Sequence, residues 1–250
     1  MLRLLAKPLV RFDTIRQAIA AEPTGVQCLE NKQVSVELQY NPLASKRGGF
    51  KMAFKGSTDP PLFESGATVS VKQAYYFDHN SDKTKASSVK VFEGPAQATR
   101  LVMECQCLVY ATTLFNETVA WIAKQEEHFG PLPPSLVVPS MRFVKAYYAY
   151  EPGAESPLQT RHFLIEEFID CEESAEGSFT KYINNNSAKP TDMQDMNHIV
   201  RGKYLAFTQH VQYYLTDGQA YVTDYQGARC QQYTWLAVNL MQYSEQVECR

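Results

Sequence analysis

The sequence of 250 residues lacks any long hydrophobic run. Near the N-terminus, Arg3 and Lys7 interrupt an apolar stretch before a signal-peptide core or a membrane span can form. We therefore expect an intracellular protein, cytoplasmic or nuclear, with no membrane association. An excess of positive charge is also missing, because 24 Lys and Arg stand against 27 Asp and Glu, a net charge of -3. A basic footprint for nucleic acid is thus absent, and we expect no nucleic-acid partner.

Paired cysteine motifs are missing as well. The six cysteines are scattered, without the spacing of a disulfide framework or of a four-ligand zinc cage. We therefore expect free thiols in a reducing compartment. What is present is 44% hydrophobic and 20% charged residues, a composition typical of a folded globular chain rather than of a disordered one.

Period-two alternation of apolar and polar residues marks the first third of the chain. It predicts strands at about 33–39, 50–55 and 67–76, the last of which carries Lys72. The Asn-Pro pair at 41–42 is expected to end the first strand. The Gly-containing loop that follows predicts a hairpin between the first two strands.

A stretch without Gly or Pro, from Ala96 to about Lys124, has apolar residues three and four apart and predicts one long helix or two in series. A second helix is expected at about 195–204. Further strands are expected at 136–138, 143–148, 163–168, 207–214 and 220–222, the last two around the turn at 217–218. This order of strands, a helix, strands and a mixed second half favours an α+β fold.

Several residues have the chemistry of a nucleotide site. Gly48, Gly49 and Lys51 can offer backbone N–H groups and positive charge to phosphates, and Lys72 can add a second cation from the neighbouring strand. Lys90 is a rival for that second cation. We rank it lower because no Gly-rich hairpin lies at a comparable distance from it.

A late turn supplies oxygen ligands. Asp224 and Gln226 stand two residues apart after a predicted strand, and their oxygens are of the kind that Mg²⁺ prefers. Glu104, on the long predicted helix, is a candidate partner for Lys72, although a surface position is the default for a helix Glu.

In this order the motifs resemble those of the alpha-type protein kinases. The resemblance covers roughly residues 34 to 227, and the ordered set is far more specific than any one motif. The matching segments are the hairpin at 46–54, the lysine strand at 69–75, a hinge-like segment at 163–168, the stretch 177–182 with the Asn run after it, and the Asp-x-Gln-Gly turn at 224–227.

The resemblance implies a two-lobed α+β fold of the protein-kinase type, as in the alpha-kinases, with an incomplete C-terminal lobe. Residues 1–30 would then be an N-terminal extension, and 31–250 the kinase-like domain. Within that domain we expect an N-lobe at about 31–165 and a partial C-lobe at about 166–250.

The implied function is an ATP- and Mg-dependent serine/threonine protein kinase, which transfers the ATP γ-phosphate to a protein substrate. Asp224 would position or deprotonate the acceptor hydroxyl and would bind the metal together with Gln226, while Lys72 would bind the phosphates and serve catalysis. The nucleotide-binding residues implied by the resemblance are Gly48, Gly49, Lys51, Lys72 and Glu166, the last at the adenine hinge.

Two departures from the family pattern keep other functions open. The family has a second metal-binding Asp about ten residues after the first, where this chain has Thr234. The residues after Gly227 contain no His for the family's zinc module. The alternative is a catalytically inactive pseudokinase that serves as a nucleotide-binding or scaffold module, and a third reading is an unrelated α+β interaction protein.

Overall fold

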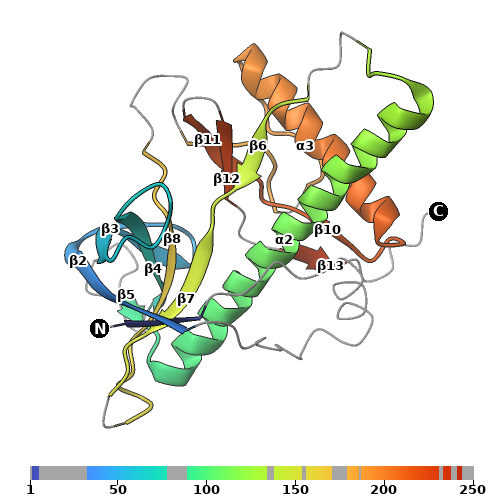
Figure 1. Ribbon diagram of the computed structural model, residues 1–250. Helices are drawn as coiled ribbons and strands as arrows, with labels where there is room; N and C mark the ends of the chain where they lie inside the picture. The colour runs from blue at the N-terminus through green and yellow to red at the C-terminus, as the bar shows by residue number, and fades with distance from the viewer. Residues whose placement is uncertain are drawn as a thin grey trace. The chain divides into compact units, whose positions relative to one another are not determined.

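The computed structural model describes residues 2–5, 33–77, 89–133, 138–153, 156–170, 179–185, 187–230, 233–237 and 241–243. The chain divides into two compact units (Figure 1). Unit 1 comprises Met1–Pro8, Val26–Gln106 and Lys145–Phe168. Unit 2 comprises Leu9–Gly25, Cys107–Val144 and Ile169–Arg250.

Unit 1 is built on an antiparallel sheet whose strands pair in the order β3-β2-β1-β7-β8-β4-β5. Because β3 also pairs with β4, the strands from β3 round to β4 form a closed ring of pairings, which leaves no open edge among them. The strands are β1 (Leu2–Leu5), β2 (Gln33–Arg47), β3 (Lys51–Asp59), β4 (Thr68–Phe77), β5 (Val89–Val91), β7 (Ala146–Tyr150) and β8 (His162–Glu167).

The two faces of this sheet carry different side chains. Val71 of β4 lies opposite Phe54 of β3 and Ile165 of β8, and all three belong to one buried apolar cluster. The next residue, Lys72, points to the other face because successive strand residues alternate. On that face the first half of helix α2 (Gly94–Phe129) covers the sheet, burying Leu101 and Cys105 against Ala74, Tyr148 and Leu164.

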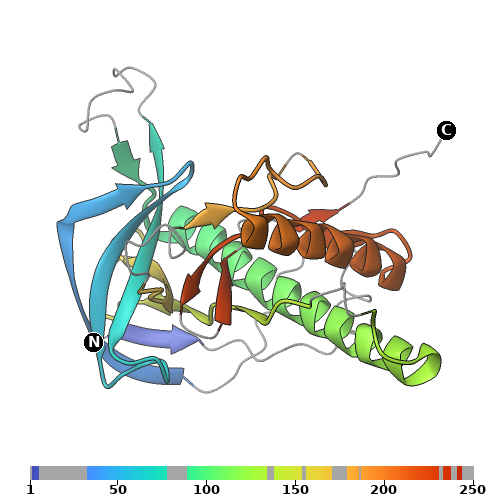
Figure 2. The ribbon, with the colours of Figure 1, turned by 90° about the horizontal axis from the view of Figure 1, so that it is seen from above.

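Unit 2 combines the second half of α2 with helix α3 (Met196–Leu215) and two small sheets. The two helices lie side by side (Figure 2). They contact each other through aromatic pairs, Phe115 with Tyr204 and Trp121 with Phe207. One sheet has the order β6-β12-β11-β9, and the other pairs β10 with β13. The strands are β6 (Met141–Phe143), β9 (Thr180–Lys181), β10 (Ala220–Val222), β11 (Gln226–Cys230), β12 (Tyr233–Ala237) and β13 (Met241–Tyr243).

Most of the expected elements are confirmed. The hairpin is β2–β3, the lysine strand is β4, the segment at 163–168 is β8, and the long helix is the single helix α2. The turn at 217–218 is present, with both residues at positive φ. The strand expected at 143–148 is instead β6 and β7, and residues 136–137 lie outside the described residues.

Two of the expected boundaries are wrong. Strand β2 continues past the Asn-Pro pair, because a register shift between Tyr40 and Ser45 takes Pro42 out of the pairing. The segment 207–214 is helical rather than extended, and it completes α3. There Asp195 caps the helix, accepting from His198 N at 2.9 Å, and packing of the apolar face overrides the strand preference of the aromatic residues. No helix in the described part of the chain is long and apolar enough to cross a membrane.

Candidate functional site

The hairpin that joins β2 to β3 is held by its own backbone and by β4. Gly48 N donates to Lys51 O at 2.9 Å, and Tyr75 Oη donates to Gly48 O at 2.6 Å. Gly49 is open, since a Cβ there would meet nothing within 4 Å. The N–H of Gly48 is therefore used inside the hairpin, whereas Gly49 leaves room for a ligand to approach the backbone closely.

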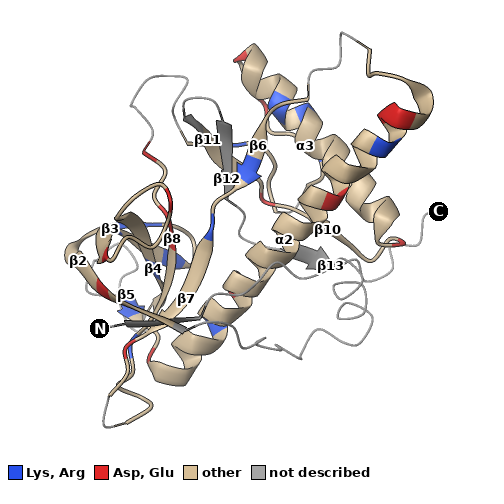
Figure 3. Ribbon diagram, in the orientation of Figure 1, with Lys and Arg blue, Asp and Glu red and all other residues tan. Residues whose placement is uncertain are grey.

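Two lysines of the sheet face that α2 covers are each held by a carboxylate. Lys51 Nζ lies 2.6 Å from Glu104 Oε2 of α2, and Lys72 Nζ lies 2.5 Å from Glu166 Oε2 of β8. The side chains are largely buried, with 12% of Lys51 and 19% of Lys72 exposed. Figure 3 marks the charged residues of β4 and β8. Partial burial makes both pairs stronger and less screened than surface ion pairs.

Strand register explains this grouping. Lys72 lies opposite Ala53 in β3 and Leu164 in β8, so Lys51 and Glu166, each two residues along its strand, share its face. The structure thus brings together three of the expected nucleotide-binding residues, Lys51, Lys72 and Glu166. The pairing differs from the sequence expectation in one respect, because Glu104 contacts Lys51 rather than Lys72. Lys90, the rival lysine, is exposed on β5.

In unit 2 the expected catalytic carboxylate sits on a tight turn between β10 and β11. Asp224 has a φ of 57°, a left-handed conformation that a non-glycine residue rarely adopts. Its side chain is only 5% exposed and forms an ion pair with Lys181 of β9, whose side chain is 40% exposed. The sequence analysis did not identify Lys181. The structure identifies it, because Lys181 pairs with Gln226 across β9 and β11.

Side chains of helix α3 hold this turn in place through buried hydrogen bonds. Gln209 Nε2 donates to Val222 O at 2.7 Å, and Val222 N donates to Gln212 Oε1 at 2.8 Å. Gln212 Nε2 also donates to Tyr225 Oη at 3.1 Å, and Thr208 Oγ1 lies 3.3 Å from the same hydroxyl. Complete burial raises the pKa of Tyr225 to about 12, so this phenol stays protonated. The network holds Asp224 in its strained conformation.

The turn offers few ligands to a metal ion. The described residues contain no group of three or more His, Cys, Asp or Glu that could hold a metal by themselves. Gln226 is half-buried at the start of β11, beside the turn that carries Asp224. One carboxylate and one amide oxygen suit a Mg²⁺ ion that takes its remaining ligands from phosphates and water. Thr234, at the position where the resemblance implies a second metal-binding Asp, pairs with Arg229 in the β11–β12 ladder.

Comparison with known proteins identifies the fold. A structure described as a novel alpha kinase from Entamoeba histolytica aligns over 99% of this chain and 80% of its own, with 14% identity and a TM-score of 0.58. The alpha-kinase domain of myosin-II heavy chain kinase A in complex with AMP-PNP aligns over 84% of this chain and 75% of its own, with 13% identity and a TM-score of 0.50. An inactive form of that domain complexed with ATP gives the same identity and TM-score over 84% of this chain and 76% of its own.

These likenesses confirm the expected α+β fold of the alpha-kinase type. Comparison with curated protein sequences gives no match. The model of the alpha-kinase family, however, matches residues 46–245, which is most of the chain and includes every candidate site residue named above. The chain therefore belongs to the alpha-kinase family.

Proposed function

We propose that this protein is an ATP- and Mg-dependent serine/threonine protein kinase, which transfers the γ-phosphate of ATP to a hydroxyl of a protein substrate. The observation that carries the proposal is the pair of oriented lysines on one face of unit 1, within a chain of the alpha-kinase family. Phosphoryl transfer requires mainly positioning and neutralisation of charge, which such lysines supply.

In this proposal unit 1 binds the nucleotide. Lys72 and Lys51 contact its phosphates, Gly48 and Gly49 shape the hairpin beside them, and Glu166 serves the adenine end while it holds Lys72. The 2.5 Å contact between Lys72 and Glu166 supports the assignment, because a carboxylate restricts a flexible lysine to one direction. The likeness to alpha-kinase domains solved with ATP and AMP-PNP supports it also.

Unit 2 supplies the acid–base chemistry in the same proposal. Asp224 accepts a hydrogen bond from the hydroxyl of the protein substrate and takes up its proton as the hydroxyl oxygen bonds to the γ-phosphorus, while the bond from that phosphorus to the bridging oxygen breaks and ADP leaves. Lys181 fixes the direction of the Asp224 carboxylate through their ion pair. Asp224 and Gln226 would hold Mg²⁺, which when bound supplies positive charge to the phosphate oxygens.

We also propose that unit 1 corresponds to the nucleotide-binding lobe of the family and unit 2 to its catalytic lobe. The boundaries suggested by the sequence, 31–165 and 166–250, divide the chain once. The compact units instead assign residues 107–144, in the second half of α2 and beyond, to unit 2.

Transfer of label from γ-labelled ATP to a basic acceptor protein tests the function. The wild-type chain should label the acceptor on Ser or Thr when Mg²⁺ is present, and Asp224→Asn should lower the rate by about 100-fold or more. Asp192→Asn, at an exposed aspartate of the same unit, is the matched control and should retain the wild-type rate. A wild-type chain that binds ATP without transferring label would overturn the kinase proposal.

That outcome would support the second candidate, an inactive pseudokinase that acts as a nucleotide-binding or scaffold module. One observation favours it: Thr234 occupies the place where the resemblance implies a second metal-binding Asp, and its hydroxyl is a weaker ligand for Mg²⁺ than a carboxylate. Thr234→Asp therefore separates the candidates further, since it should restore transfer in an otherwise intact pseudokinase.

A further inference from the structure

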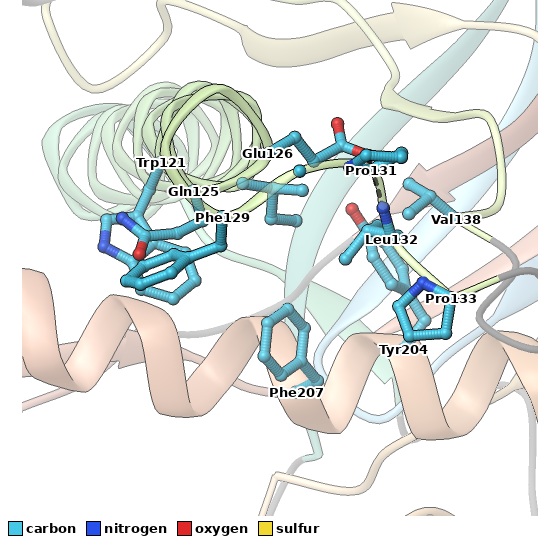
Figure 4. A pocket seen from close by; sticks show the side chains of 12 residues that line it. Trp121, Gln125, Glu126, Phe129, Pro131, Leu132, Pro133, Val138, Tyr204 and Phe207 are labelled. Carbon is cyan, nitrogen blue, oxygen red and sulfur yellow. Dashed lines mark hydrogen bonds between the residues drawn. The ribbon is translucent and has the colours of Figure 1, made fainter.

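Unit 2 contains a pocket that the kinase proposal does not use. It lies between the second half of α2 and the middle of α3 and has a volume of about 620 Å³ (Figure 4). That volume is in the range of about 300–1,000 Å³ found for small-molecule sites. Its lining residues differ from those that hold the Asp224 turn, although Phe207 of the pocket directly precedes Thr208 of the turn network.

Aromatic rings from both helices line the pocket. Trp121 and Phe129 come from α2, and Tyr204 and Phe207 come from α3 (Figure 4). Phe129 is 78% exposed and Phe207 43% exposed, whereas Tyr204 is buried with Ile122. The pocket thus has a buried floor and a rim of solvated rings, and those rings lose exposed apolar surface when a ligand enters.

The charge of the pocket selects the ligand. Among the described residues that line it, Glu126 is the one that carries a charge, and no lysine or arginine is present. Glu126 Oε1 accepts a hydrogen bond from Leu132 N at 3.3 Å, which holds the carboxylate at the wall (Figure 4). Aromatic faces carry negative quadrupole potential, so the rings and the carboxylate attract the same sign of ligand charge. An anionic ligand would meet both unfavourably.

We propose that this pocket binds a small organic cation, an ammonium group on an aromatic or branched aliphatic body. The ammonium lies beside Glu126 and the body packs among Trp121, Phe129 and Phe207. This site is independent of the nucleotide and of Asp224, so it stands whether or not the chain transfers phosphate.

Three probes of matched shape test the charge preference by calorimetric titration in the absence of ATP. Phenethylammonium, phenethyl alcohol and hydrocinnamate carry positive, neutral and negative groups on the same phenyl body. We expect the ammonium to bind at least about fivefold more tightly than the alcohol, and hydrocinnamate to bind most weakly. Equal affinity for the ammonium and the alcohol, tighter binding of hydrocinnamate, or no binding of any probe would overturn the proposal.

Two substitutions one residue apart locate the site. Glu126→Gln should remove the preference for the ammonium and leave the affinity for the alcohol unchanged. The amide keeps an acceptor for Leu132 N and loses only the charge. Glu127→Gln, at an exposed glutamate outside the pocket, should keep the preference. Phe207→Ala should weaken the binding of the ammonium and of the alcohol by the same factor. A preference that survives Glu126→Gln would contradict the proposed orientation, provided that the variant melts as the wild type does.

Discussion

Both units orient a proposed functional group by an ion pair, but the functional partner is the cation in unit 1 and the anion in unit 2. In unit 1 the proposed functional groups are the cations Lys51 and Lys72, and carboxylates on regular elements orient them. In unit 2 the proposed functional group is the anion Asp224, on a strained turn, and a half-exposed lysine orients it. A strand fixes its side chain through register, whereas a turn needs a dedicated hydrogen-bond network.

The difference predicts where each unit is vulnerable. The lysines of unit 1 lie on a sheet whose two apolar clusters do not depend on them. Their replacement should abolish ligand binding and should also cost stability through the carboxylates left without a cation, while the apolar clusters stay intact. The Asp224 turn depends on its partners, and loss of one of these should change stability first.

Among the substitutions in unit 2, the largest effect on stability is expected from Lys181→Met. It leaves the Asp224 carboxylate, 5% exposed, without its cation, and this should cost about 1–2 kcal/mol of unfolding free energy, less than a fully buried pair because Lys181 is partly solvated. Urea denaturation measures the loss. The double variant Lys181→Met with Asp224→Asn should lose less than the single Lys181 variant, because no uncompensated charge remains. Additive losses in the double variant would contradict the ion pair.

Lys72→Ala should cause a change of comparable size in the free energy by which Mg-ATP stabilises the protein. Mg-ATP at about ten times its Kd should stabilise the wild type by about 1.4 kcal/mol, and this gain should vanish in the variant. The variant leaves the Glu166 carboxylate, 11% exposed, without its cation, so it should melt below the wild type without ligand, and the gain is measured from each protein's own ligand-free stability. Lys90→Ala, at an exposed lysine of the same unit, is the control and should keep the gain. If Lys90→Ala loses the gain and Lys72→Ala keeps it, the rival lysine is the phosphate ligand.

Tyr225→Phe should cost about 1 kcal/mol, because it removes the oxygen that Gln212 Nε2 reaches at 3.1 Å and leaves a buried donor without that acceptor. The measurement is again the urea midpoint. Tyr214→Phe, at a 70% exposed tyrosine of α3, should lie within about 0.5 kcal/mol of the wild type. Equal costs for the two variants would show that the network does not support the turn.

The smallest effect concerns pH and distinguishes the units again. Burial lowers the pKa of His162, whose Nδ1 lies 2.6 Å from Tyr148 Oη in unit 1. The unfolded chain then takes up this proton at a higher pH than the folded one. The contribution of His162 is therefore fully present above the ordinary value of 6.5 and is lost as the pH falls through and below it.

Urea denaturation at about pH 7.5 and about pH 5.5 should show this loss, and His162→Gln should reduce it. His210→Gln, at an exposed histidine of α3, should leave the loss unchanged. Tyr225 in unit 2, with its pKa of about 12, contributes nothing in this range. An identical pH dependence in wild type and His162→Gln would contradict the prediction.

The sequence predicted those parts of the site that depend on local pattern. Alternation placed Lys72 and Glu166 on strands, and the Asp-x-Gln-Gly segment was identified as a turn. The sequence did not predict which carboxylate contacts which lysine. Lys72 and Glu166 are 94 positions apart, and their contact follows from the β4–β8 register. The same holds for Lys181, on a strand of two residues too short to show a period.

Helix α3 shows the opposite failure. Its second half is rich in aromatic and β-branched residues, which favour strands. Leu205, Thr208 and Gln212 are nevertheless buried along one face of the helix. Tertiary packing determined the outcome there, and with it the support of the Asp224 turn.

We propose that the chain is a kinase in which unit 1 binds the nucleotide and Asp224 of unit 2 carries out transfer. The most direct test measures both the Mg-ATP melting shift and γ-phosphate transfer in wild type, Lys72→Ala and Asp224→Asn. We predict that Lys72→Ala loses both, whereas Asp224→Asn loses transfer and keeps a melting shift, reduced by the loss of one ligand to Mg²⁺. A wild-type chain with no melting shift, or an Asp224→Asn variant that still transfers phosphate at the wild-type rate, would contradict it.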